Sequence, residues 1–351
     1  MKVLVLGGTG AMGVHLVQLL SNKNIETVVT TRNFIQSTDV NIKYIKGNAH
    51  NKEFLQSLLM KPWDAIIDFM VYSTQDFKDR VSLLLNSTSQ YIFLSSSRVY
   101  SDALEYITEK TPRLLDVSND FEFLATDEYA LSKARQEDIL KNTGKINWTI
   151  IRPYITYSEK RLQLGVLEKE EWLYRALKGR TIIFSKDILS KETTLTYGLD
   201  VSKGIQHIIG EKSAIGETYN ITSNESVTWK EVLSIYLEVI ENKIGYKPKV
   251  IYSDLNSFIK THPATYQIKY DRLFNRKFDS SKIYRFIDLR EFTQIKLGLK
   301  KCIECFVDNP KFDFINWELE AIKDRQAIES TPLNEIKGLI NKYIYLKNRY
   351  L

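Results

Sequence analysis

Short apolar runs alternate with longer amphipathic stretches from Met1 to about Arg152. Each run is long enough for a buried strand, and each stretch repeats its apolar positions at helical spacing. This alternation is typical of β-α-β units, and six strands are enough for a Rossmann-type, doubly wound parallel sheet. The expected strands are Val3–Leu6, Thr27–Thr31, Lys43–Ile45, Ala65–Phe69, Tyr91–Ser95 and Trp148–Arg152, and the expected helices are Ala11–Leu20, Lys52–Leu59, Phe77–Leu85 and Asp127–Lys141.

The regular alternation stops after Pro153, so we place a domain boundary there and expect a smaller α/β lobe over residues 154–351. The lobe contains two stretches without a clear period, Lys186–Tyr197 and Asp254–Arg276, which we expect to be loops near a ligand. The segment Pro332–Leu351 is amphipathic and aromatic, which indicates a final packed helix or an oligomer contact. The other expected elements are helices at Gln163–Lys178, Leu199–Ile209, Thr228–Ile240 and Leu289–Val307 and a strand at Thr218–Ile221.

The composition is that of a globular protein, with 43% apolar and 26% charged residues among 351. The longest apolar runs are far shorter than the roughly 20 residues that cross a bilayer, and no cleavable leader is visible. We therefore expect a cytoplasmic protein without a membrane partner. The net charge is +6, but basic and acidic residues are interleaved, which does not require nucleic acid and suits a small phosphorylated ligand.

The two cysteines, Cys302 and Cys305, are too few for a disulfide framework. They lie in an apolar-periodic stretch from Phe292 to Phe306, with no second Cys or His pair to complete a tetrahedral zinc site. We expect both to pack within a helix. We expect no metal site.

A glycine-rich turn, Gly7 to Gly13, joins the first expected strand to the first expected helix. In this context, backbone N–H groups and the positive end of the helix dipole can hold a pyrophosphate. Gly7 permits the tight turn, Gly10 lets a ligand approach the backbone, and Gly13 lets the helix pack closely. The turn therefore predicts a bound dinucleotide.

The second expected strand ends at Thr31-Arg32-Asn33, where an acidic residue would accept hydrogen bonds from an adenosine ribose. No acid is present, and the guanidinium of Arg32 is suited to a 2′-phosphate. NADP is therefore the favoured cofactor, with NAD as the alternative.

Tyr129 and Lys133 are four residues apart, which places them on one face of an expected helix. A phenol has an ordinary pKa near 10, so it exchanges protons at neutral pH only if a nearby cation stabilises the phenolate. Lys133 supplies such a cation, and its other donors suit the ribose hydroxyls of a cofactor. Upstream, Ser95, Ser96 and Ser97 follow a buried strand at the edge of the sheet where ligands bind.

The glycine turn, the serine strand, the Tyr/Lys helix and the pair Arg152-Pro153 follow one another in the order of the extended short-chain dehydrogenase/reductase family, which the chain resembles. In the second half, Thr194–Val201 resembles the family's returning strand and helix, and Tyr219–Ile221 its late strand. The resemblance therefore implies a dinucleotide-binding domain over 1–153, a substrate-binding lobe over 154–351, and a return of about 194–209 to the first domain.

The resemblance implies that Tyr129 is the general acid/base, Lys133 its electrostatic and ribose partner, and Ser96, four residues before Tyr100, the group that polarises the substrate carbonyl. The residues expected around the dinucleotide are Gly7, Thr9, Gly10, Ala11, Met12, Gly13, Arg32, Asn48, Phe69, Met70, Ser95, Tyr129, Lys133, Pro153 and Ile155. The residues expected at the substrate are Ser73, Ser97, Arg161, Thr194 and Arg272, the two arginines as partners of a diphosphate.

The implied function is NAD(P)-dependent chemistry on a nucleotide-activated sugar. We expect first a ketoreductase, in which NADPH reduces a keto-sugar while Tyr129 gives the proton. The alternatives are a 4-epimerase with bound NAD and a non-catalytic nucleotide-sensing or RNA-associated protein on the same fold. Ser97 and Arg98 stand where 4,6-dehydratases of the family carry Asp-Glu, which disfavours dehydration. Ile155 and Ser158 also depart from many nucleotide-sugar members, and a homodimer is left open.

Overall fold

The computed structural model describes residues 1–351, which form two compact units. Unit 1 comprises residues 1–158, 194–225 and 277–295. Unit 2 comprises residues 159–193, 226–276 and 296–351. The chain therefore leaves unit 1 after residue 158 and returns to it twice.

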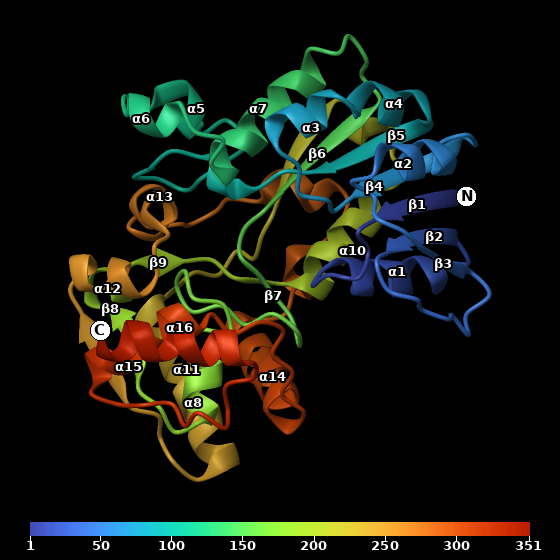
Figure 1. Cartoon of the computed structure of the whole chain (residues 1–351). Coiled ribbons are helices and arrows are strands. Elements are labelled where there is room, and N and C mark those ends of the chain that lie inside the picture. Colours follow the sequence, from blue (N-terminus) through green and yellow to red (C-terminus); the bar gives the residue numbers. More distant parts are fainter. The chain divides into compact units, whose positions relative to one another are not determined.

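A seven-stranded parallel sheet forms the centre of unit 1 (Figure 1). Its order is β11-β6-β5-β4-β1-β2-β3, and all neighbouring strands are parallel. The order reverses between β1 and β4, which confirms the predicted doubly wound fold. The strands are β1 (Lys2–Leu6), β2 (Glu26–Thr31), β3 (Ile42–Lys46), β4 (Trp63–Asp68), β5 (Thr88–Leu94), β6 (Trp148–Pro153) and β11 (Glu217–Ile221).

Helices cover both faces of this sheet, which is why its strands read as unbroken apolar runs. One apolar cluster joins the sheet to α1 and α10, which lie side by side, and another joins it to α2, α4 and α7. The helices of unit 1 are α1 (Gly13–Ser21), α2 (Lys52–Leu58), α3 (Thr74–Lys78), α4 (Val81–Asn86), α5 (Leu114–Val117), α6 (Phe121–Leu124), α7 (Tyr129–Lys141) and α10 (Gly198–Ile208). Its short elements are η1 (Ser97–Val99), η2 (Lys212–Ala214), η4 (Ser281–Arg285), η5 (Leu289–Glu291) and the parallel pair β7 (Thr156–Tyr157) and β10 (Thr196–Tyr197).

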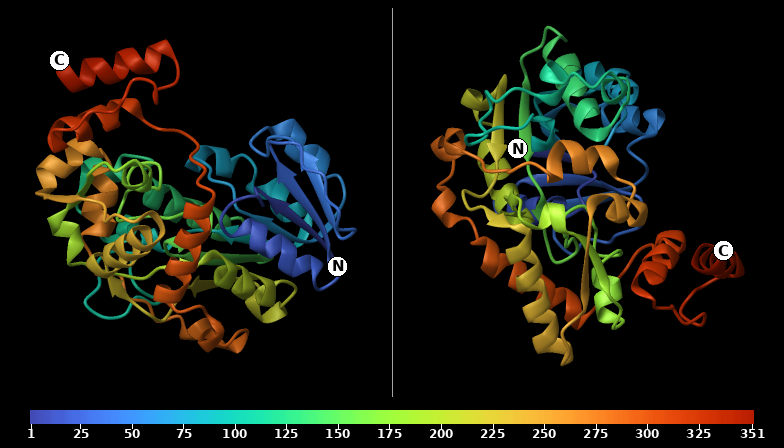
Figure 2. Two further views of the ribbon diagram at one scale, coloured as in Figure 1. Left: turned by 90° about the horizontal axis from the view of Figure 1, so that it is seen from below. Right: turned by 90° about the vertical axis from the view of Figure 1, so that its left-hand side faces the viewer.

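Unit 2 is mainly helical, with β8 parallel to β13 and β9 antiparallel to β12. In both views of Figure 2 its two C-terminal helices, α15 and α16, lie side by side. The strands are β8 (Ile182–Ser185), β9 (Glu192–Thr193), β12 (Val227–Thr228) and β13 (Val250–Ser253). The helices are α8 (Leu173–Leu177), α9 (Lys186–Leu189), α11 (Trp229–Ile244), α12 (Leu255–Thr261), α13 (Thr265–Gln267), the π-helix η3 (Ile268–Arg272), α14 (Ile295–Asp308), α15 (Trp317–Ala327) and α16 (Leu339–Tyr350).

Several predicted elements are wrong in extent. The predicted helix Phe77–Leu85 is two helices, α3 and α4, with Arg80 at φ −124° between them. The predicted helix Gln163–Lys178 is helical only in α8, because Gly165 has φ +60° and Leu164 pairs with Leu167 in a turn. The helix predicted from Leu289 starts at Ile295 as α14.

Both predicted loops contain regular structure. The stretch Lys186–Tyr197 holds α9, β9 and β10, and Asp254–Arg276 holds α12, α13 and η3. Asp254 accepts a hydrogen bond from the backbone of Ser257 and thereby caps α12, a start signal that the sequence analysis overlooked. In α14, Cys302 is buried as expected, but Cys305 is exposed.

Candidate functional site

The turn between β1 and α1 combines tight packing with one open position. Gly7 has φ +72°, which favours glycine. A Cβ on Gly8 would lie 2.7 Å from a side-chain carbon of Val29, and a Cβ on Gly13 would lie 2.6 Å from the backbone of Gly8. A Cβ on Gly10 would meet no heavy atom within 4 Å. The chain itself therefore requires three of these glycines, whereas Gly10 faces open space.

This turn fits a dinucleotide. The space beside Gly10 adjoins the N-terminus of α1, where the positive end of the helix dipole favours a phosphate. Phe69 and Met70 follow β4 and lie next to Gly7, since a Cβ on Gly7 would be 3.7 Å from the Phe69 Cβ and 3.0 Å from the Met70 Sδ. Thr9 is exposed, and Ala11 and Met12 are partly exposed.

The start of α10 closes on the same turn, a feature that the sequence analysis did not identify. A Cβ on Gly198 would lie 2.3 Å from the carbonyl oxygen of Ala11. The Ser202 hydroxyl lies 2.8 Å from the carbonyl oxygen of Met12 and 2.7 Å from that of Gly198, and its single hydrogen can be donated to either oxygen. These contacts hold the backbone of the turn from the side of α10. A glycine opening a predicted helix was the available signal.

Two of the residues predicted around the dinucleotide, Arg32 and Asn48, lie at one end of the sheet. Arg32 follows β2 directly and is exposed. Asn48 comes shortly after the neighbouring strand β3, is exposed, and accepts a hydrogen bond from the backbone of His50 at 3.1 Å. Both positions therefore lie at carboxyl ends of adjacent parallel strands, the edge where ligands bind in such sheets.

Tyr129 opens α7, and Lys133 follows one turn later on the same face. The Lys133 side chain is buried, donates a hydrogen bond to the carbonyl of Leu94 at 2.8 Å, and places its Nζ 6.0 Å from the Tyr129 ring centroid. Burial lowers the pKa of Lys133 to about 8, against the opposing effect of Asp68 and Glu137. The predicted pair is thus brought together around a buried ammonium group.

A second cation, not assigned from the sequence, lies beside the phenol. The guanidinium carbon of Arg98 is 5.2 Å from the Tyr129 ring centroid. Arg98 forms an ion pair with Glu128, which caps α7 by accepting a hydrogen bond from the backbone of Ala130 at 2.6 Å. The ring of Tyr129 therefore lies beside two cationic side chains, Arg98 and Lys133.

The three serines after β5 have different partners. Ser95 donates to Glu137, and Ser97 donates to the carbonyl of Arg152 at 2.9 Å. Ser96 instead accepts a hydrogen bond from the backbone of Arg98 at 3.2 Å, which uses an oxygen lone pair and not the hydroxyl hydrogen. Ser96 is therefore the serine best suited to donate to a substrate oxygen.

A buried charge network lies behind these residues. Arg152, at the end of β6, donates to Glu137 of α7 at 2.8 Å and to the Tyr100 hydroxyl at 2.8 Å. That hydroxyl donates to Asn220 of β11 at 2.8 Å. Burial alone would raise the pKa of Glu137, but the hydrogen bonds and charge of Arg152 lower it overall. The network joins β6 and β11 of the sheet to α7.

The remaining candidates of unit 1 lie in different surroundings. Pro153 ends β6, and Ile155 is buried two residues later. Ser73 is exposed and caps α3 by accepting a hydrogen bond from the backbone of Asp76 at 3.0 Å. Thr194 is buried.

The two arginines predicted to bind a diphosphate belong to unit 2. Arg161 donates to Glu168 at 2.8 Å. Arg272 is buried, forms an ion pair with Asp271, and donates to the carbonyl of Gly165 at 2.9 Å. These contacts give Arg272 a structural part in holding the turn at Gly165.

A doubly wound parallel sheet with a glycine turn between its first strand and first helix defines a Rossmann-type fold. The chain belongs to the NAD dependent epimerase/dehydratase family, whose model matches residues 3–222. This match confirms the family resemblance that the sequence motifs predicted. The elements from α11 to α16 follow the matched region.

Among curated relatives, the chloroplast stem-loop binding protein of 41 kDa b from Arabidopsis thaliana is 24% identical over 248 residues, 65% of this chain and 60% of that protein. Two solved structures share the fold. MoeE5 in complex with UDP-glucose and NAD is 17% identical, with a TM-score of 0.66, covering 89% of this chain and 100% of that one. UDP-glucuronic acid 4-epimerase from Bacillus cereus in complex with UDP-glucuronic acid and NAD is 18% identical, with a TM-score of 0.64 and coverage of 88% and 99%.

Proposed function

We propose that this protein interconverts epimers of a nucleotide-activated sugar with the help of NAD. The observation that carries the proposal is the phenol of Tyr129 at the start of α7, with the buried ammonium of Lys133 6.0 Å from its ring. Similarity in fold to enzymes solved with NAD and UDP-sugars supports the class of substrate.

Each residue has a defined task in this proposal. Tyr129 takes a proton from a sugar hydroxyl as that carbon is oxidised and gives it back on reduction. Lys133 and Arg98 stabilise the phenolate, and Ser96 donates a hydrogen bond to the same sugar oxygen. A bound nicotinamide dinucleotide supplies the oxidation and reduction, held by Gly7, Gly10 and the N-terminus of α1.

A second candidate is the reduction of a keto-sugar by NADPH. The observation that favours it is the exposed Arg32 at the end of β2, where no acid is present to recognise an unphosphorylated ribose. The reductase would use Tyr129 as the acid and consume its reductant, whereas the epimerase regenerates NAD within each cycle.

A third candidate is a non-catalytic protein, which the similarity to a stem-loop binding protein supports. The Tyr/Lys pair is the observation against it, because a nucleotide sensor has no need of an ionisable phenol beside two cations.

One experiment separates the three candidates. The purified protein is incubated with UDP-glucose or UDP-glucuronic acid and NAD, and proton NMR follows the sugar. If the protein is an epimerase, epimers of the sugar should form while the absorbance spectrum shows no net conversion of NAD to NADH. Consumption of NADPH with a 4-keto nucleotide sugar instead identifies the reductase, and cofactor binding without either reaction identifies the sensor.

A further inference from the structure

The last helix of unit 2 carries an exposed apolar stripe. Leu339, Tyr343, Leu346 and Tyr350 of α16 are 84%, 66%, 39% and 63% exposed. Their spacing of four, three and four residues places them on one helix face. Ile340, which is 76% exposed, widens the apolar surface at the start of the helix. Single exposed apolar residues are ordinary, but an aligned set marks a binding surface.

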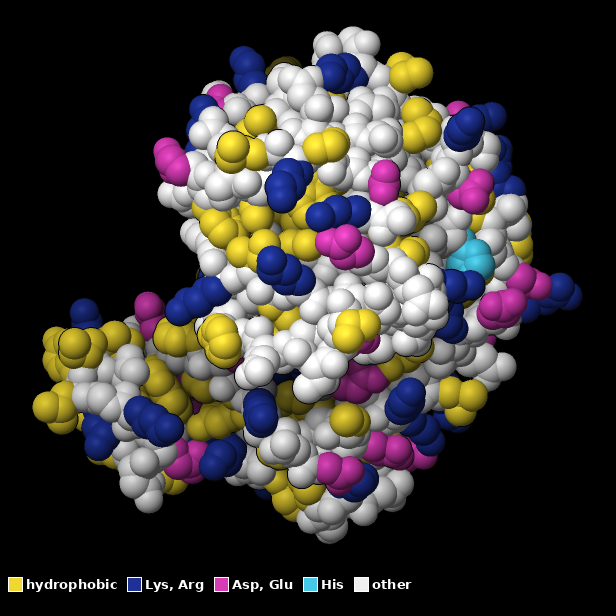
Figure 3. Space-filling view, turned by 90° about the vertical axis from the view of Figure 1, so that its right-hand side faces the viewer, with side chains coloured by type: hydrophobic (Ala, Val, Ile, Leu, Met, Phe, Trp, Pro, Cys, Tyr) yellow, Lys and Arg dark blue, Asp and Glu magenta, His cyan; other side chains and the backbone are white.

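Positive charges border this stripe on both sides. At helical spacing, Lys342 and Arg349 lie along one border and Lys347 along the other. The segment 336–351 contains four Lys and Arg residues and no Asp or Glu. Figure 3 shows hydrophobic side chains with Lys and Arg among them at its lower left, where the C-terminal helices lie.

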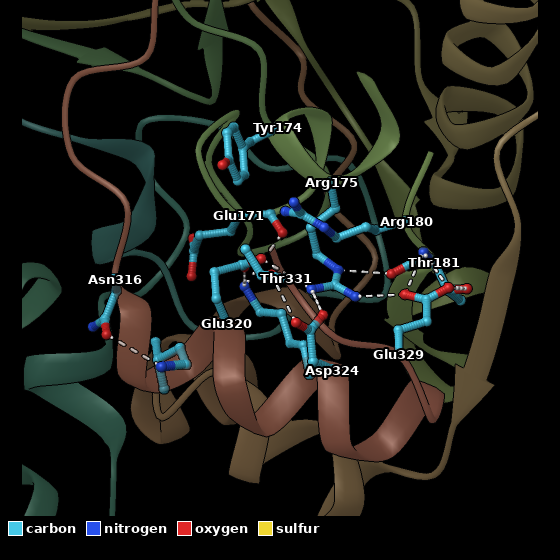
Figure 4. A network of polar contacts seen from close by, with 12 residues as sticks. Glu171, Tyr174, Arg175, Arg180, Thr181, Asn316, Glu320, Asp324, Glu329 and Thr331 are labelled. Atoms are coloured by element: carbon cyan, nitrogen blue, oxygen red, sulfur yellow. Dashed lines mark hydrogen bonds and ion pairs between the residues drawn. The ribbon is translucent and has the colours of Figure 1, made fainter. Parts of the chain in front are cut away.

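The opposite side of α16 is anchored to unit 2, which fixes the direction of the stripe. Tyr345 is 1% exposed, donates to Asp324 of α15 at 2.6 Å and accepts from the backbone of Thr331 at 2.6 Å. Asp324 in turn pairs with Arg175 at 2.8 Å, within the network of Figure 4. The helix therefore cannot turn its stripe inward without breaking buried polar contacts.

We propose that α16 binds the surface of an anionic lipid bilayer and lies in the plane of the interface. In this position the leucines enter the acyl boundary, and the two tyrosines of the stripe lie at the level of the headgroups. Lys342 and Lys347 extend sideways to lipid phosphates, whereas Arg349 donates a hydrogen bond to the carbonyl of Glu329 at 2.8 Å. No helix of the structure has the length and apolarity of a membrane span. The proposal departs from our expectation that membranes play no part.

Charge favours a bilayer over a second copy of the chain as the occupant. Two α16 stripes placed face to face would bring two sets of cations together with no acidic residue of either helix between them. Like charges across an interface are destabilising, whereas an anionic surface complements them. Because α16 lies outside the region matched by the family model, the proposal does not depend on the proposed function.

Vesicle flotation of the full chain tests the proposal. The protein is mixed with vesicles of phosphatidylcholine containing about one third phosphatidylglycerol, or of phosphatidylcholine alone. We expect binding to the anionic vesicles that weakens as salt is raised. Lys342→Gln with Lys347→Gln should weaken it roughly 30-fold. Leu346→Glu should abolish it, because the charge would enter the acyl boundary.

Leu104→Glu is the matched control, since Leu104 is 100% exposed in unit 1. It should bind vesicles like the unmodified protein, and all variants should keep the circular dichroism spectrum and NAD affinity. Equal binding to both vesicle types, no binding to either, or no effect of Leu346→Glu would overturn the proposal. So would a dimer in sedimentation that Leu346→Glu dissociates, because a second copy would then be the occupant.

Discussion

Each unit contains a buried arginine that forms ion pairs with carboxylates, Arg152 in unit 1 and Arg175 in unit 2. In unit 1, Arg152 pairs with a single carboxylate, Glu137, and its remaining contact goes to a tyrosine hydroxyl. In unit 2, Arg175 is shared by Glu320, Asp324 and Glu329 at 2.8 to 3.0 Å. Both guanidinium groups are nearly inaccessible to solvent.

The difference lies in what each network joins. Glu137 is one helical turn after Lys133, so the Arg152 network fixes the helix that carries the acid/base pair. The Arg175 network joins α8 to α15 and to the segment after α15 (Figure 4). It therefore attaches the C-terminal helices to α8. A buried charge without its partner is costly, and each network is therefore strongly interdependent.

Removal of the arginine from unit 2 should have the largest effect on stability. Arg175→Met leaves Asp324 buried without its cation, while Glu320 keeps its pair with Lys323 at 2.9 Å, and we expect a loss of roughly 3–5 kcal/mol in the free energy of unfolding. Urea unfolding followed by tryptophan fluorescence measures it. Turnover and NAD affinity of the folded fraction should stay unchanged. A loss below about 1 kcal/mol would show that the Arg175 network does not attach the C-terminal helices to α8.

Glu137→Gln tests the other side of the comparison. It keeps the shape of the side chain but leaves Arg152 buried without its carboxylate, at a cost of about 3 kcal/mol. Unlike Arg175→Met, it should also lower kcat, because α7 is no longer held. Steady-state assays of both variants at a temperature where each is folded decide the matter. Equal kcat values in the two variants would contradict the assigned division of tasks.

The pH dependence of stability tests whether the ammonium group of Lys133 is buried in the folded protein. The pKa of Lys133 is lowered to about 8 from 10.5, so the unfolded chain holds the proton to higher pH. Between these values the unfolded state binds more protons, and the contribution of Lys133 to stability rises with pH. Relative to Lys133→Met, the protein should gain on the order of 3 kcal/mol over this range. A difference that does not change with pH would show that the ammonium is solvated.

Arg32 is an exposed arginine, in contrast to the buried Arg152 and Arg175, and Arg32→Ala should have the smallest effect on stability. Because Arg32 is exposed, its loss should change the free energy of unfolding by no more than about 0.5 kcal/mol. If a 2′-phosphate binds there, NADP affinity alone should fall, by about 1.5–3 kcal/mol per charge-assisted bond. Calorimetric titration with NADP and NAD measures both affinities. A parallel loss for the two cofactors would exclude phosphate recognition by Arg32.

Local patterns predicted unit 1 better than unit 2. The strands of the sheet and the helix of Tyr129 follow from apolar runs and spacing that the chain shows within about 15 residues. The segment Asp254–Arg276 has polar and aromatic residues on several sides, and its helices are stabilised by tertiary packing that no short window contains. Their start was marked by Asp254, but a capping residue alone does not give the length of a helix.

In the candidate site, too, local spacing predicted some residues, and only the tertiary fold shows the surroundings of others. Tyr129 and Lys133 are joined by a spacing of four residues, which the sequence contains in full. The approach of Arg98 to Tyr129 depends on how η1 packs against α7, and the burial of Arg272 depends on Gly165, more than 100 residues earlier. A guanidinium looks suitable for a diphosphate in any sequence. Only the fold shows whether the protein already uses it.

The turnover of Tyr129→Phe, which removes the ionisable hydroxyl and keeps the ring, tests whether Tyr129 is the general acid/base. With a nucleotide sugar that the unmodified protein converts, turnover should fall by about 10²–10⁴-fold, while NAD affinity changes little. Lys133→Met serves as the comparison, because it should lower both turnover and NAD affinity. Undiminished turnover in Tyr129→Phe would contradict the assignment of Tyr129 as the general acid/base.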